Sequence, residues 1–110
     1  MAFTAYHNIT GSTGVDVELI APGLNAGNIK SIMITNTHVT ADATVSLFIQ
    51  DDPTSAATKT FYILSTVAIP SDTSLLLDNS SVLSFNNSSS GYGLYITVGS
   101  SDTLDVMINR

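Results

Sequence analysis

The chain has 110 residues, of which 44% are hydrophobic and only 11% are charged, with a formal net charge of −6 and no cysteine. This length suits one domain with one hydrophobic core, and disordered chains have the opposite composition, rich in charge and poor in apolar residues. Three basic residues are too few for a phosphate-binding patch, and the lack of cysteine excludes disulfides and thiolate metal sites.

The acidic balance also disfavours binding to an anionic membrane surface. The N-terminal residues contain no basic stretch followed by an apolar run, so no signal peptide is predicted. No apolar stretch approaches the ~20 residues that a membrane-spanning helix needs. Neither a nucleic acid nor a membrane is therefore expected among the partners.

The N-terminal segment differs in its pattern from the rest of the chain. Phe3, Tyr6 and Ile9 follow one another at three-residue spacing, whereas a half-buried strand has two-residue spacing, and a Gly/Ser/Thr run comes after them. A segment before such a hinge is weakly held by its own domain. Residues 1–14 are expected to form either an arm that docks on a neighbouring subunit or an irregular first strand, followed by a β-sandwich domain at 15–110.

From residue 15 onward, apolar and polar residues alternate with a period of two, which is typical of strands with one buried face. Clusters of Ser, Asn, Asp, Gly and Pro separate the alternating segments, and helical spacing of apolar residues is not found. The pattern predicts an all-β fold: a single-domain antiparallel β-sandwich, jelly-roll-like, with about eight strands and almost no helix. The segments expected as strands are 15–19, 31–35, 45–49, 61–64, 67–69, 75–77, 82–85, 94–98 and 104–109.

The inward-facing apolar residues of these strands are expected to form a core between two sheets. Two polar segments, 51–59 and 86–91, are expected as loops. The predicted core consists of Ile32, Ile34, Val45, Leu47, Ile49, Ile63, Ile69, Leu75, Leu77, Leu94, Ile96, Leu104, Val106 and Ile108.

The sequence offers little of the chemistry that enzymes need. The only histidines, His7 and His38, lie far apart, and neither belongs to a nucleophile motif. Paired carboxylates are interpreted as a solvent-facing strand surface or as turn initiators, although clustered oxygens could also hold calcium. We therefore predict no enzymatic activity, no cofactor and no metal site. The carboxylate pairs are Asp16 and Glu18, Asp51 and Asp52, and Asp102 and Asp105.

Three tyrosines, Tyr62, Tyr92 and Tyr95, are further candidates for contact with a partner. They could form an aromatic platform for a sugar, but the absence of tryptophan favours cross-strand packing or a protein interface. The predicted interface residues are Phe3, Tyr6, Ile9, Tyr62, Tyr92 and Tyr95.

The later part of the chain contains a characteristic series of segments. They are Ile-Met-Ile-Thr-Asn-Thr at 32–37, an Ala/Thr/Val strand at 43–49, Phe-Tyr-Ile-Leu at 61–64, Val-Ala-Ile-Pro at 67–70, Ser-Leu-Leu-Leu at 74–77 and Leu-Asp-Val-Met-Ile at 104–108. This series resembles small β-sandwich accessory structural proteins of tailed-bacteriophage virions, of the marine and cyanobacterial phage type. The resemblance covers residues 29–110. It implies a virion structural role, as a capsid decoration or cement subunit or as a neck, tail or fibre component.

The partners implied by this resemblance are copies of the same chain, in a homo-oligomer, and other virion proteins such as the major capsid, neck or tail proteins. The implied location is the virion, assembled in the host cytoplasm. Low charge fits the role because it reduces repulsion between closely packed copies, and edge strands could pair with a neighbour.

Two other functions stay open. One is a carbohydrate-binding or adhesin-like module. The other, less favoured, is a small metal-dependent enzyme of the jelly-roll type, which would need two or three histidines on neighbouring strands.

Overall fold

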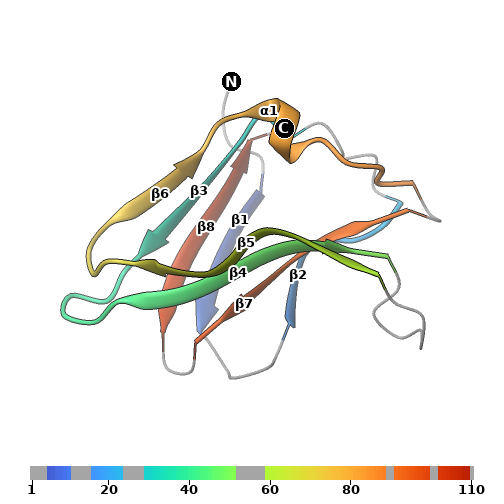
Figure 1. Ribbon diagram of the computed structural model, residues 1–110. Coiled ribbons are helices and arrows are strands. Elements are labelled where there is room, and N and C mark those ends of the chain that lie inside the picture. Colours follow the sequence, from blue (N-terminus) through green and yellow to red (C-terminus); the bar gives the residue numbers. More distant parts are fainter. Residues whose placement is uncertain are drawn as a thin grey trace.

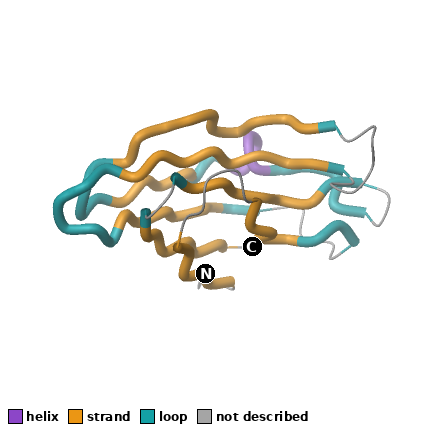
Figure 2. Tube along the Cα trace, turned by 90° about the horizontal axis from the view of Figure 1, so that it is seen from below, coloured by secondary structure: helices purple, strands orange, loops and turns teal. Residues whose placement is uncertain are grey.

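The computed structural model describes residues 5–10, 16–23, 29–51, 59–88, 91–99 and 102–109 of the chain. Strands make up most of these residues, and the helix among them is the four-residue turn α1 (Ser80–Leu83) (Figure 1, Figure 2). No helix within the described ranges has the length and apolar character needed to cross a membrane. The strands are β1 (Ala5–Thr10), β2 (Asp16–Ile20), β3 (Ser31–Asn36), β4 (Ala43–Gln50), β5 (Thr60–Ile69), β6 (Ser74–Leu77), β7 (Gly93–Val98) and β8 (Thr103–Asn109).

The eight strands form two four-stranded antiparallel sheets that pack against each other (Figure 1). Sheet A has the order β1-β8-β3-β6, and sheet B has the order β2-β7-β4-β5. The pairing is nested, because β1 pairs with β8, β2 with β7, β3 with β6 and β4 with β5. The chain is thus one long antiparallel ribbon folded across two sheets, as in an eight-stranded jelly roll. The all-β sandwich predicted from the alternation is confirmed.

The core lies between the sheets and is built by the residues that the alternation places there. Of the fourteen predicted core residues, ten are buried, and Ile49, Ile63, Leu75 and Leu77 are half-buried and pack against them. Full burial of one such aliphatic side chain contributes roughly 1.5–3 kcal/mol, so this cluster is the main source of stability. Seven residues of the buried core cluster were not predicted as core: Ile9, Leu19, Ile20, Ile29, Ala43, Leu83 and Val98.

The segment at 82–85, expected as a short strand, instead forms the end of α1 and the residues that follow it. The side-chain oxygen of Asn79 accepts a hydrogen bond from the backbone N–H of Ser81 at 3.0 Å and caps the helical turn. This cap satisfies an amide that the first turn of a helix leaves without a backbone partner. The turn carries Leu83 into the core, so local capping prevails over a weak alternation.

Strand β5 at the edge of sheet B departs from regular pairing. The register between β4 and β5 shifts on both sides of Leu47. At one shift, Thr66 has a left-handed φ of 53°, and its N–H donates to Ser46 Oγ at 2.9 Å. These bulges explain why the segment at 61–64 is apolar on both faces, because strict alternation between inside and outside is broken there. Bulges also make an edge strand a poor template for pairing with another chain.

Candidate interaction surfaces

The outer face of sheet A carries one apolar row that crosses all four strands. The register pairs Tyr6 of β1 with Met107 of β8, Met107 with Met33 of β3, and Met33 with Leu76 of β6. Directly paired residues point to the same face, so the four side chains lie in line over about 14 Å. Tyr6 and Leu76, at the two ends, are 67% and 52% exposed, and both methionines are half-buried. We call these four residues the sheet A row.

A row of polar side chains lies beside the sheet A row, and these side chains form hydrogen-bonded pairs. Asn8 Nδ2 donates to Asp105 Oδ1 at 2.6 Å, and the hydroxyl oxygens of Thr35 and Ser74 are 2.8 Å apart. Among the described strand residues that face outward from sheet A, Asp105 is the one charged side chain. Because these polar groups already have partners, few hydrogen bonds would be lost if another surface covered this face.

The outer face of sheet B carries an aromatic row. Tyr62 of β5 pairs with Phe48 of β4, Phe48 pairs with Tyr95 of β7, and Tyr95 pairs with Glu18 of β2. The ring centroid of Phe48 lies 5.2 Å from that of Tyr62 and 6.1 Å from that of Tyr95, whose hydroxyl donates to Glu18 Oε2 at 3.2 Å. Phe48 and Tyr95 are buried, whereas Tyr62 is 59% exposed. Tyr95 is therefore a cross-strand packing residue, and Tyr62 is the member of the row that a partner can reach.

A crevice of about 260 Å³ opens beside the start of β5. Phe61, at its edge, is exposed and packs edge-on against Tyr92, with ring centroids 5.8 Å apart. Such an apolar lining suits an apolar side chain of a protein, because a sugar needs several polar groups to fix it. The crevice is lined by Ile49, Phe61, Tyr62, Ile63, Ser84 and Phe85.

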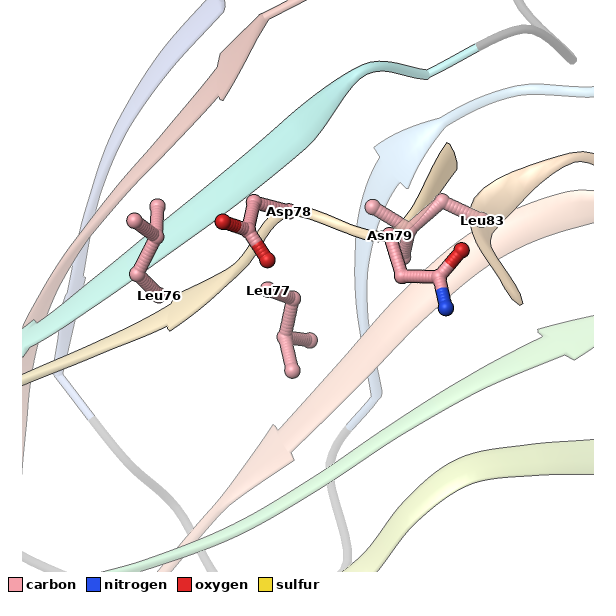
Figure 3. Close-up of a pocket in the computed structure, with 5 residues that line it drawn as sticks. All are labelled: Leu76, Leu77, Asp78, Asn79 and Leu83. Carbon is pink, nitrogen blue, oxygen red and sulfur yellow. The ribbon is translucent and has the colours of Figure 1, made fainter. Parts of the chain in front are cut away.

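A smaller hollow of about 170 Å³ lies where β6 passes into α1 (Figure 3). Leu76 and Leu77 point to opposite sides of β6, with Asp78 and Asn79 following them (Figure 3). Leu77 and the buried Leu83 make its interior apolar, and the exposed Asp78 and Asn79 make its rim polar. Since Leu76 also belongs to the sheet A row, the hollow adjoins the β6 end of that row. We call it the β6–α1 hollow.

The predicted interface residues of the N-terminal segment lie in different environments. Tyr6 and Ile9 are both on β1, but Tyr6 points outward from sheet A, and Ile9 is buried in the core. Residues 5–10 pair with β8 along their whole length, so this stretch is an edge strand of the sandwich. Phe3 lies outside the described residues.

The three tyrosines of the predicted interface also separate. Tyr62 is exposed and lines the crevice, Tyr92 is half-buried against Phe61, and Tyr95 is buried in the aromatic row. Sequence reasoning missed the partners that make Tyr6 part of a surface, Met33, Met107 and Leu76, although period two places each of them on an outward face of its strand. Only the sheet order, which the sequence does not reveal, brings them into line.

The titratable candidates make hydrogen bonds that hold turns. His38 Nδ1 accepts two backbone N–H bonds from within its own turn, at 3.1 Å each. Asp51 Oδ1 accepts from the Lys59 N–H at 2.7 Å, and Asp102 Oδ2 accepts from the Thr44 N–H at 3.0 Å. Within the part of the chain that the structure describes, no three His, Asp or Glu side chains gather as metal ligands.

Two buried asparagines connect loops to strand ends. Asn36 Nδ2 donates to the carbonyl oxygens of Ala41 and Ile69 at 2.9 and 3.0 Å, and its Oδ1 accepts from the His38 N–H at 3.0 Å. Asn87 Nδ2 donates in the same way to two carbonyl oxygens, at 3.0 and 2.7 Å. Asparagines in turn clusters are usually exposed, so this burial could not be predicted from the sequence.

Comparisons of the chain with known protein families, with curated proteins and with solved structures found no match. Among the described residues, two surfaces are suited to contact with other molecules. One is the sheet A row with its adjoining hollow, and the other is the crevice with Phe61 and Tyr62.

Proposed function

We propose that the protein is a structural subunit of a bacteriophage virion, most directly a decoration or cement subunit of the capsid, and that it acts by packing against other protein subunits. The main support is that large apolar side chains are exposed in two separate places. These are Tyr6 and Leu76 on sheet A, and Phe61 and Tyr62 at the start of β5. Clustered exposed apolar residues mark interaction sites.

Two separate surfaces suit a subunit that touches more than one neighbour. The resemblance of residues 29–110 to virion accessory proteins supports the same role. A neck, tail or fibre position would use the same kind of contacts, and these positions differ from a decoration role in the number of copies per particle.

The carbohydrate-binding alternative receives less support. Among the residues that line the crevice, only Tyr62 and Ser84 carry a polar side-chain group. Sugar recognition relies on several convergent polar groups around an aromatic platform. Binding of the purified protein to a glycan array, lost on the substitution Tyr62→Ser, would favour this alternative over a virion role.

The first test is the composition of purified particles of the phage that encodes the chain. A decoration subunit is expected in a fixed ratio to the major capsid protein, measured by quantitative mass spectrometry. Far fewer copies would place the chain in the neck, tail or fibre. Absence from particles that are otherwise complete would contradict the proposal.

The second test is rebinding of the purified protein to particles that lack it. The variant Phe61→Ser is expected to bind more weakly than the unmodified chain because it removes an exposed apolar contact beside the crevice. Val39→Ser is the control, since Val39 is also apolar and exposed but stands alone in the loop between β3 and β4. Equal loss with both variants would argue against a specific surface at β5.

A further inference from the structure

We infer that the outer face of sheet A is the contact surface for a second copy of this chain, in a two-fold dimer in which the sheet A rows of the two copies pack against each other. This deepens the proposed function by naming a partner and its surface. It rests on the proposed function only in placing the dimer within a virion.

The sheet A row is complementary to itself under a two-fold axis that runs parallel to the strands. Such an axis reverses the strand order, so the β1 end of one row meets the β6 end of the other. Tyr6 of each copy then faces Leu76 and the mouth of the β6–α1 hollow of the other copy. A protruding phenol at one end of the row and an apolar hollow at its other end are thus matched twice in the same dimer.

The residues that line the hollow suit the chemistry of a tyrosine side chain. Its apolar interior suits an aromatic ring, and the exposed carboxylate of Asp78 at its rim can accept a hydrogen bond from the phenol hydroxyl. In the middle of the row, Met107 of one copy faces Met33 of the other. Methionine side chains adapt readily to an opposing surface, which suits this central contact.

The polar and charged groups of this face permit its burial. The chain has nine acidic residues and a net charge of −6, so contact between copies is favoured where acidic side chains are few. On the described strands of sheet A, only Asp105 faces outward with a charge, and it accepts a hydrogen bond from Asn8. Under the same axis Asp105 faces the hydroxyl of Thr35 in the other copy, which is itself a possible donor, while the two carboxylates are offset by one strand.

The area of the face sets the strength of the dimer. Four strands about 4.8 Å apart, with a mean length of about six residues at about 3.3 Å per residue, give a plan area of roughly 400 Å². Stable interfaces bury about 800 Å² per partner, so this face supports a weak, concentration-dependent dimer. On a particle surface, where copies are held side by side, the same contact would be strengthened by high effective concentration.

Sedimentation velocity of the full chain between about 1 µM and 1 mM tests the inference, because this range covers weak association. The average mass is expected to rise towards that of a dimer. Leu76→Ser and Tyr6→Ser are each expected to weaken association at least about tenfold, since each substitution acts twice in a two-fold interface. Val39→Ser is the control, since Val39 is also exposed but lies in the loop between β3 and β4, outside both proposed surfaces, and it should leave association unchanged.

A chain that stays monomeric at every concentration would overturn the inference, as would association that Tyr62→Ser disrupts and Leu76→Ser does not. If the chain is monomeric and Leu76→Ser is lost from particles, the face binds another virion protein; the dimer then fails and the proposed function stands. If the chain dimerises in solution but is absent from particles, the dimer stands and the proposed function fails.

Disulfide trapping tests the orientation, and the absence of cysteine makes each introduced thiol unique. A mixture of Tyr6→Cys and Leu76→Cys chains is expected to give mixed disulfide dimers under mild oxidation. Disulfides formed only within the Leu76→Cys sample would contradict the placement of Tyr6 at the hollow. Val39→Cys, which lies outside both proposed surfaces, measures random cross-linking at the same concentration.

Discussion

Replacing Asn36 by alanine is expected to destabilise the domain strongly, although the residue touches no proposed interface. Asn36 is fully buried, and its side chain makes three hydrogen bonds to backbone groups of Ala41, Ile69 and His38. Each such bond contributes about 1 kcal/mol net, so their loss together costs about 3 kcal/mol. This is a large part of the ~5–15 kcal/mol by which domains are stable, and it corresponds to a fall in melting temperature of roughly 10–20 °C.

Thermal and urea unfolding followed by circular dichroism measure the effect. Asn79→Ala provides the comparison, since it removes one hydrogen bond at an exposed helix cap and is expected to cost about 1 kcal/mol. If Asn36→Ala were no more destabilising than Asn79→Ala, the three buried hydrogen bonds would not hold the β3–β4 loop in the way described.

The variant Asn36→Asp adds a pH dependence with a defined sign. It places a carboxyl oxygen against the carbonyl oxygens of Ala41 and Ile69, and burial together with these oxygens raises the pKa of the introduced carboxyl in the folded state. Relative to the unmodified chain, the variant is therefore most stable below the unfolded pKa of about 4. This relative stability is lost as the pH rises through the raised pKa of the folded state. A variant that grew more stable between pH 4 and pH 7, relative to the unmodified chain, would refute this.

Three further predictions concern the core, the edge and the turns. Leu47→Asp is expected to prevent folding, because a buried carboxylate without a partner costs several kcal/mol. Ala68→Asp, on the exposed side of β5, should fold. A soluble, cooperatively melting Leu47→Asp variant would show that the buried and exposed faces are misassigned. Deletion of residues 2–10 is expected to lower the melting temperature strongly because it removes β1 and the buried Ile9, and an unchanged melting curve would mean that this strand contributes little. EDTA is expected to leave the melting temperature unchanged, and a sharp drop would reveal a calcium site.

Most of the fold follows from period-two alternation, because a strand with one face in the core must alternate. β3 and β8 obey it throughout, so Ile32, Ile34 and Val106 could be assigned to the core from the sequence alone. Alternation fails where another interaction decides. Leu83 is buried through a helical turn that Asn79 caps, and the register shifts beside Leu47 disturb the pattern of β5.

The surfaces could be predicted less well than the core. Tyr6 was predicted as an interface residue from the spacing of the N-terminal segment and Tyr62 from its aromatic character, and both are exposed. Tyr95 belongs to the same residue type but is buried, since Phe48 and Glu18 flank it on neighbouring strands. The neighbours of a strand residue depend on sheet order, and sheet order is set by contacts far apart in the sequence, which a pattern of local alternation does not contain.

The edges of the two sheets favour association through faces. Sheet A ends in β1 and β6, and sheet B ends in β2 and β5. β5 is interrupted by bulges, β2 has a register shift between Glu18 and Ile20, and β6 is only four residues long. Each of these features makes a poor template for pairing with another strand. Edge pairing, which the sequence left open, is thus restricted among the described strands to β1, whereas the sheet A row runs unbroken from β1 to β6. In the proposed dimer the chain contacts its second copy through the outer face of sheet A, while most of its edges resist open-ended strand addition.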